Sequence, residues 1–503
     1  MPAAAAFLSL LALPTRADLQ LPSVLSSNMV LQQGRSDAVW GWDTPGTAVT
    51  IAFRGQTRTA QAGADGRWQV SVPAGSAGGP FPLTITGSTA ITLNNVLVGE
   101  VWVTGGQSNM WWHVANCTDA KAETAAAGYP AIRYWDANTS PTQAGWGADT
   151  PQRTVKAEWK VTTPQVVSDY AGVPYFFARD LYRTLKVPVG IVHISVPGTE
   201  IEQHLSPTFL QRNLPQAMEL YGRRAREYPA LKQQYDAAHA AWAVSKAGEE
   251  PKAPGDPQGN APGWLYNGMV APTAPFTCRG FLWWQGEYNA DRSLQYRVLF
   301  PGLIEEWRQA WADETLPFLF VELANFGPTQ TQPVEEAAWP SLRDAQREAL
   351  RLPGTYEVSA IDVKTQAEGD WAIHPVHKQI VGHRLFLSAM ANVYGRKITG
   401  ADSPALGGVS YVGDRATITF NHAGSGLVAR GGILRGFALA GADRQFYRAD
   451  ASLRGNSVLV TSPDVTRPVA VRYDWGNNPI GSLYNREGLP TFPFRTDQWN
   501  LQK

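Results

Sequence analysis

The sequence contains little cysteine and little charge, and these shortages exclude several classes of protein. Only two cysteines, Cys117 and Cys278, occur in 503 residues, too few for a disulfide-rich scaffold or a cysteine-based zinc cluster. Charged residues make up 17% of the chain, and 43 Lys and Arg balance 43 Asp and Glu. Because there is no net charge and no run of Lys or Arg, we expect neither nucleic acid nor a membrane surface as a partner.

Metal-binding patterns are also missing. The sequence has no His-x-x-x-His pair of the kind that binds zinc from one face of a helix. We therefore expect no metal and no other cofactor. The two cysteines could pair in an oxidising compartment or stay apart as buried thiols, and the sequence leaves both open.

Apolar runs in this sequence are short. The run at the start of the chain has the composition of a targeting segment. Residues 1–18 are rich in Ala and Leu and resemble the apolar core of a signal peptide, although a basic leader is missing. The run is too short to anchor the chain in a bilayer. It predicts a protein that is periplasmic in a bacterium, or secreted.

Aromatic residues, in contrast, are plentiful, at 11% of the chain with 19 Trp. Large β-sheet cores would account for this number. Sugar binding would account for it equally well, because indole rings pack on the apolar faces of sugars and their N–H groups donate to hydroxyls.

The chain is long enough for several domains, and its patterning divides it into three regions after the leader. Short alternating strands predict a β-sandwich-like unit over 19–98, and strands alternating with helices predict a parallel α/β sheet over 99–404. Strands return in a β-rich region at 405–503, which could pack with the first unit. A helical and Pro-rich insertion at about 206–264 could cap a ligand crevice or extend into solvent.

The most informative stretch is the apolar run 96–104, which predicts a buried strand and is followed by Gly105, Gly106, Gln107 and Ser108. Two glycines permit a tight turn and a close approach of the backbone. A serine at the carboxyl end of such a strand lies where open α/β sheets bind ligands. Its hydroxyl would sit beside free backbone N–H groups, an arrangement that suits a nucleophile with an oxyanion hole, although Gly and Ser also dominate ordinary turns.

Three further polar segments follow predicted strands and complete a possible reaction site. They are 195–202 (SVPGTEIE), 284–290 (WQGEYNA) and 369–378 (GDWAIHPVHK). With Ser108 they would supply a nucleophile, a backbone donor, an amide donor and an imidazole.

These four segments, in this order, resemble the sequence blocks of SGNH hydrolases, named for Ser, Gly, Asn and His. Within that superfamily, the residues of the four segments are similar to those of sialate O-acetylesterases and related carbohydrate acetylesterases, which include bacterial enzymes acting on xyloglucan. Further stretches extend the resemblance over most of residues 20–400: 28–33 (NMVLQQ), 39–42 (VWGW), 265–269 (LYNGM) and 342–346 (LRDAQ).

The resemblance implies a three-layer α/β/α, flavodoxin-like domain at 99–404 and a serine esterase mechanism. Ser108 would attack an acetyl carbonyl, and His374 would act first as base and then as acid. The oxyanion hole would consist of the N–H groups of Ser108 and Gly198 and the side-chain amide of Asn289. The substrate would be an acetylated oligo- or polysaccharide; the oligomeric state is left open.

One departure from the family pattern concerns the acid that orients the histidine. Many members carry a carboxylate three residues before it, where this chain has Trp371, or two residues before it, where this chain has Ala372. We assign the role to Asp370, with Asp362 as the second choice. A backbone carbonyl could also orient His374, which would leave a Ser–His dyad.

Polar residues beside the blocks are candidates for binding sugar hydroxyls: Gln107, Asn109, Gln285, Glu287 and Arg343. For Arg343, an exposed ion pair on a helix is an equal alternative. The sequence thus predicts a carbohydrate O-acetylesterase acting on a plant cell-wall glycan such as xyloglucan. Three alternatives remain: a sialate O-acetylesterase, a non-catalytic carbohydrate-binding protein on an esterase scaffold, and a glycosidase with paired carboxylates.

Overall fold

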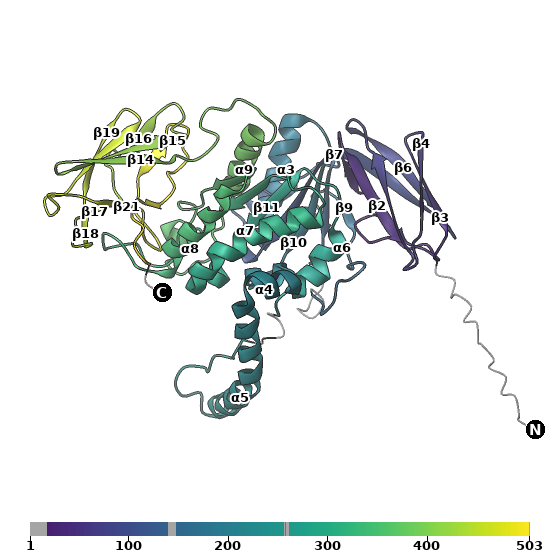
Figure 1. Ribbon diagram of the computed structural model, residues 1–503, viewed down its shortest axis with the longest axis horizontal. Helices are drawn as coiled ribbons and strands as arrows, with labels where there is room; N and C mark the ends of the chain where they lie inside the picture. Colours follow the sequence, from purple (N-terminus) through teal and green to yellow (C-terminus); the bar gives the residue numbers. More distant parts are fainter. Residues whose placement is uncertain (1–17, 139–146, 256, 258–260, 502–503) are drawn as a thin grey trace, which may run out of the picture.

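The computed structural model describes residues 18–138, 147–255, 257 and 261–501. All but the last residue of the predicted leader at 1–18 lies outside this described part. Three assemblies of secondary structure follow one another along the long axis of the molecule (Figure 1). They are an N-terminal β unit, a central α/β body and a C-terminal β unit, and the body carries a long projecting helix.

The central body is built on a mostly parallel sheet. In spatial order its strands are β13 (Thr355–Val358), β12 (Phe318–Val321), β11 (Gly280–Trp284), β7 (Ala90–Gly106), β10 (Val189–Ser195), β8 (Ile132–Asp136) and β9 (Trp159–Val161). Neighbours pair in parallel, except that β9 runs antiparallel to β8.

Both faces of this sheet are buried, as continuous apolar strands require. Along β11, Phe281 and Trp283 belong to one hydrophobic core, whereas Leu282 and Trp284 belong to the other. Helices α3 (Gly172–Leu185) and α9 (Lys378–Asn392) cover the second core, and α7 (Ser293–Ala310) and α8 (Ala338–Gln346) cover the first. The predicted three-layer α/β/α architecture is therefore confirmed.

Strand β7 continues from the N-terminal unit into the central sheet without interruption. Its first part pairs with β6 (Gly78–Thr86) and β1 (Val30–Gln32), and its last part pairs with β10 and β11. The remaining strands of the unit are β2 (Ser36–Trp42), β3 (Ala48–Phe53), β4 (Gln56–Gln61) and β5 (Arg67–Pro73). The sequence boundary at 98/99 thus falls inside a single strand.

The C-terminal β unit lies at the opposite end of the molecule from the N-terminal one (Figure 1), so the two do not pack together. It has its own hydrophobic core. Its strands are β14 (Ala405–Val412), β15 (Arg415–Asn421), β16 (Leu427–Ala429), β17 (Phe437–Ala440), β18 (Phe446–Arg448), β19 (Asp450–Arg454), β20 (Ser457–Thr461), β21 (Ala470–Tyr473), β22 (Leu483–Asn485) and β23 (Phe494–Arg495).

The predicted insertion forms α4 (Pro207–Asn213) and the 31-residue helix α5 (Pro215–Ser245), which projects away from the body (Figure 1). Shorter helices are α1 (Ser108–Trp111), α2 (Ala120–Ala125) and α6 (Ala271–Thr273). In the described part of the chain no helix combines the length and the apolarity that a membrane crossing requires. Cys117 and Cys278 are both buried and free.

Candidate active site

Three of the four predicted site segments begin where neighbouring strands end at one level of the central sheet. Gly106 at the end of β7 lies in register with Ser195 of β10 and with Trp284 of β11. The loops that follow these strands carry Ser108, Gly198 and Asn289. Parallel strands place their carboxyl ends at one edge, and this edge is where open α/β sheets bind ligands.

Gly106 makes the turn that presents Ser108. Its φ of +137° is a conformation that favours glycine, and a Cβ there would lie 2.1 Å from the carbonyl oxygen of Trp284. The chain then starts α1 at Ser108, whose side chain is half-buried. Within the described residues, the backbone N–H groups of Ser108 and Gly198 have no acceptor, so both are available to a ligand.

Gly198 combines a left-handed backbone with free space beside it. Its φ is +67°, and a Cβ built there would meet no protein atom within 4 Å. The N–H of the predicted oxyanion donor therefore borders an open region rather than a packed one.

Asn289 is fully buried, and its amide is held by three hydrogen bonds. Its Oδ1 accepts from the backbone N of Ile201 at 2.9 Å and from Nε2 of Gln285 at 2.7 Å, while its Nδ2 donates to Glu202 at 2.9 Å. Because the Ile201 N–H can only donate, the orientation of the amide is fixed. One hydrogen of Nδ2 serves Glu202, and the other is left for a second acceptor.

His374 lies on a segment directly next to α1. Asn109, which follows Ser108, donates from Nδ2 to the carbonyl oxygen of Ile373 at 3.0 Å. The imidazole stacks on Trp112 with a centroid separation of 4.8 Å. In the described structure no hydrogen bond joins Ser108 Oγ to the imidazole, as is common for catalytic pairs without a substrate.

The electrostatic surroundings keep His374 neutral. Burial, followed by the positive charge of Lys378, lowers the pKa of His374 to about 4. A neutral imidazole can accept a proton at neutral pH, as a general base must.

The structure shows no link between His374 and Asp370, the predicted orienting acid, and that assignment stays a prediction. The carbonyl oxygens of Gly369 and Asp370 accept from Nζ of Lys364 at 3.2 and 2.7 Å, which holds the loop by its backbone. Asp370 itself is exposed, and no hydrogen bond links its carboxylate to His374 in the described structure. Asp362, the second choice, instead forms an ion pair with Arg384 at 2.7 Å.

For two predicted sugar-binding residues, Arg343 and Gln285, the structure shows polar atoms that are bonded within the protein. Arg343 is only 1% exposed and donates to the carbonyls of Leu323, Ala324, Gly476 and Asn477 at 2.7–3.1 Å. It therefore joins the central body to the C-terminal unit, and the alternative of an exposed ion pair fails. Gln285 is fully buried and positions Asn289.

Gln107 and Glu287 brace the site loops. Oε1 of Gln107 accepts from the backbone N atoms of Gly286 and Tyr288, both at 3.3 Å. Oε1 of Glu287 accepts from Asn109 at 2.6 Å. Their contribution to sugar binding remains a prediction.

Sequence reasoning missed Lys378, which lies at the start of α9 and is fully buried. Its Nζ donates to Oδ1 of Asn109 at 2.5 Å and sits 4.4 Å from the ring centroid of Trp284. Burial lowers the pKa of Lys378 to about 7 and raises the pKa of Glu287. Asn109 thus links an ammonium and a carboxylate just behind Ser108, and only the position of Lys378 four residues after His374 hinted at this.

Comparison with known proteins agrees with this geometry. The family model for carbohydrate esterases described as sialic acid-specific acetylesterases matches residues 257–391. The sialate O-acetylesterase of Mus musculus is 29% identical over 411 residues, covering 75% of this chain and 73% of that protein. The Homo sapiens enzyme is 28% identical over 410 residues, covering 75% and 71%. The crystal structure of a carbohydrate acetylesterase from Xanthomonas citri has a TM-score of 0.80 and 35% identity, covering 96% of this chain and all of that one.

The fold and the order of the four loops define an SGNH-type hydrolase. More narrowly, the chain belongs to the sialate O-acetylesterase-like carbohydrate acetylesterases, and it is therefore a carboxylic ester hydrolase. Among the described residues, no group of three or more His, Cys, Asp or Glu is arranged to hold a metal ion.

Proposed function

We propose that this esterase removes acetyl groups from the sugar hydroxyls of a plant cell-wall glycan such as xyloglucan, with Ser108 as nucleophile and His374 as base. The observation that carries the mechanism is the pair of unoccupied backbone N–H groups, on Ser108 and Gly198, at the ends of adjacent strands. They lie beside a serine hydroxyl, which can act as a nucleophile.

The reaction proceeds in two steps at Ser108. Oγ attacks the acetyl carbon while His374 takes the hydroxyl proton, and the carbonyl electrons move to the oxygen. The N–H groups of Ser108 and Gly198 and the second amide hydrogen of Asn289 stabilise this oxyanion. The bond to the sugar oxygen then breaks, and His374 returns its proton to that oxygen. Water, deprotonated by His374, attacks the acetyl-serine in the same way and releases acetate.

Exposed aromatic side chains beside the site support a carbohydrate substrate. Trp371 lies three residues before His374, and it is 70% exposed. Tyr288, the neighbour of Asn289, is 47% exposed. Rings in such positions can pack on the apolar face of a sugar. That contact removes ring surface from water that is exposed in the free enzyme.

The proposal is tested by acetate release from 4-nitrophenyl acetate and from acetylated xyloglucan oligosaccharides, the latter followed by mass spectrometry. We expect the native chain to turn over both substrates. Ser108→Ala should lose activity on the order of 10³-fold or more. Ser71→Ala, which changes an exposed serine of β5, should keep the activity of the native chain. Equally low rates for the native chain and Ser108→Ala would indicate a non-catalytic sugar-binding protein. Reducing sugar released by Ser108→Ala would indicate a glycosidase.

A sialate O-acetylesterase is the second candidate, because the curated relatives and the matching family model carry that description. Incubation with O-acetylated sialyllactose in parallel separates the two. Loss of acetyl groups from the sialoside alone would favour this candidate over the plant glycan.

A further inference from the structure

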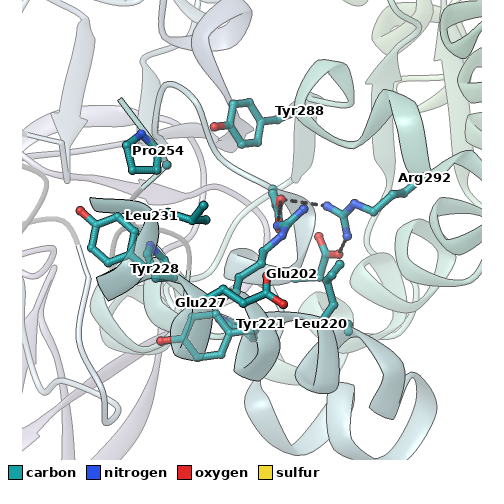
Figure 2. A pocket seen from close by; sticks show the side chains of 15 residues that line it. Glu202, Leu220, Tyr221, Glu227, Tyr228, Leu231, Pro254, Tyr288 and Arg292 are labelled. Carbon is teal, nitrogen blue, oxygen red and sulfur yellow. Dashed lines mark hydrogen bonds and ion pairs between the residues drawn. The ribbon is translucent and has the colours of Figure 1, made fainter. Parts of the chain in front are cut away.

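A cavity of about 390 Å³ lies between α5 and the loops that follow β10 and β11 (Figure 2). From the loops it is lined by Glu200, Glu202, Tyr288 and Arg292. From the insertion it is lined by Ala217, Leu220, Tyr221, Arg224, Glu227, Tyr228 and Leu231 on α5, and by Pro254, Gly255, Pro257 and Pro262. Its volume is within the range of small-molecule sites.

The walls of this cavity are bonded directly to the catalytic loops. Glu202 accepts the hydrogen bond from Nδ2 of Asn289 at 2.9 Å. The backbone N of Tyr288 donates to Gln107, the residue before Ser108, at 3.3 Å. The cavity therefore shares two wall residues, Glu202 and Tyr288, with the hydrogen-bond network that holds Asn289 and Gln107.

Helix α5 is joined to the loop after Gly198 by an ion pair. Arg224 lies 2.7 Å from Glu200, and Arg292 lies 3.1 Å from the same carboxylate. These contacts close the cavity between the helix and the body. The insertion thus does more than extend into solvent, since its first turns form one wall of a ligand-sized space.

The lining combines aromatic rings with carboxylates. Tyr228 and Tyr221 project from α5, and Tyr288 faces them from the opposite side (Figure 2). Rings offer flat apolar contact, and carboxylates accept strong hydrogen bonds from hydroxyls. This combination fits a polyhydroxylated ring with apolar faces.

The charges of the lining disfavour an anionic ring. Both guanidinium groups form ion pairs, Arg292 with Glu200 and Glu202 and Arg224 with Glu200, although Nε and Nη2 of Arg292 have no hydrogen-bond acceptor in the described structure. Glu227 adds a third carboxylate to the wall. A carboxylate-bearing sugar would meet three carboxylates against two guanidinium groups, so the net charge of the lining disfavours it.

We propose that this cavity is a subsite for an uncharged sugar residue of the glycan, next to the acetylated one, with Tyr228 and Tyr288 as its opposing walls. This inference rests on the proposed function, and it narrows the substrate to a neutral oligosaccharide. It also gives the insertion a role in choosing the substrate.

The test compares two tyrosines of the same helix. Tyr228→Ala removes a cavity wall, whereas Tyr235→Ala removes a half-buried tyrosine two turns further along α5 that does not line the cavity. We expect the ratio of kcat/KM for acetylated xyloglucan oligosaccharides to kcat/KM for 4-nitrophenyl acetate to fall at least about tenfold in Tyr228→Ala. The ratio should stay within about twofold in Tyr235→Ala.

Binding measurements separate this inference from the proposed function. Ser108→Ala is titrated by calorimetry with neutral xyloglucan oligosaccharides and with sialyllactose, alone and combined with Tyr228→Ala or Tyr288→Ala. Tighter binding of the neutral sugar, weakened at least about tenfold by either tyrosine substitution, supports the subsite. Equal affinities with and without the tyrosines, or tighter binding of sialyllactose, would overturn it. Neutral-sugar binding at the cavity without acetate release by the native chain would overturn the proposed function instead.

Discussion

The side chain of Asn109 and the backbone of Ile373 are joined by a hydrogen bond of 3.0 Å. This bond connects the residue after Ser108 to the residue before His374, although 264 positions of sequence separate the partners. Oδ1 of the same asparagine accepts from Lys378 at 2.5 Å. One amide thus connects the two segments that carry the proposed nucleophile and its base.

Asn109→Ala should lower kcat on 4-nitrophenyl acetate by about 10- to 100-fold with little change in KM, because a displacement of about 1 Å between reacting groups is enough for such a loss. Steady-state kinetics measure the effect, and circular dichroism shows whether the variant is folded. Asn116→Ala, at the end of the neighbouring turn, is the matched control. A rise in KM with an unchanged kcat would show that Asn109 binds substrate instead.

The acidic limb of the pH profile should report His374. Since its pKa is lowered to about 4, the imidazole stays neutral down to that pH, and kcat/KM should fall only below about pH 4–5. Lys378→Met removes a positive charge that lowers this pKa. The pKa of His374 should then rise toward its ordinary value, so activity should be lost at a higher pH than in the native chain. Identical acidic limbs in both proteins would contradict the electrostatic link.

Asp370→Asn should change kcat/KM by less than about threefold, because its carboxylate is exposed and does not contact His374. Loss of an acid that orients a catalytic histidine lowers kcat by about 10⁴. The two magnitudes are far enough apart for one assay of acetate release to decide between a dyad and a triad that includes Asp370.

Arg343→Met should destabilise the protein by at least about 3 kcal/mol, since four buried carbonyls lose a charged donor. Thermal and urea unfolding measure the change. Arg351→Met, at an exposed arginine eight residues later, should stay within about 0.5 kcal/mol. If KM rises without a loss of stability, Arg343 contacts substrate after all.

Local patterns were sufficient to predict the sheet and the loops that carry the site. The apolar runs around 189–195, 280–284 and 318–321 form strands β10, β11 and β12 because each fills both cores at once. Glycine at 106 and 198 has the positive φ that a tight turn after a strand implies. Most large tryptophans, such as Trp283 and Trp307, lie in these cores, whereas Trp371 is exposed.

Long-range partners could not be predicted in the same way. Arg343 finds two of its acceptors at Gly476 and Asn477, in another β unit, and nothing near residue 343 in the sequence specifies them. The burial of Lys378 follows from the placement of the start of α9 next to Asn109 of α1, which only the assembled fold decides. The loop at 369–373 is likewise held from outside, because Lys364 donates to the carbonyls of Gly369 and Asp370.

Strand β7 has a mechanical consequence. At the junction of the two units it pairs with β1 at Leu97–Gly99 and with β6 at Val96 and Val98, and it then pairs with β10 from Glu100 and with β11 from Trp102. Rotation of the N-terminal unit relative to the central sheet would have to break the hydrogen bonds between these strands. The unit therefore cannot move as a domain on a flexible linker. The N-terminal unit is therefore fixed in orientation relative to the strand end at Gly106, two residues before Ser108.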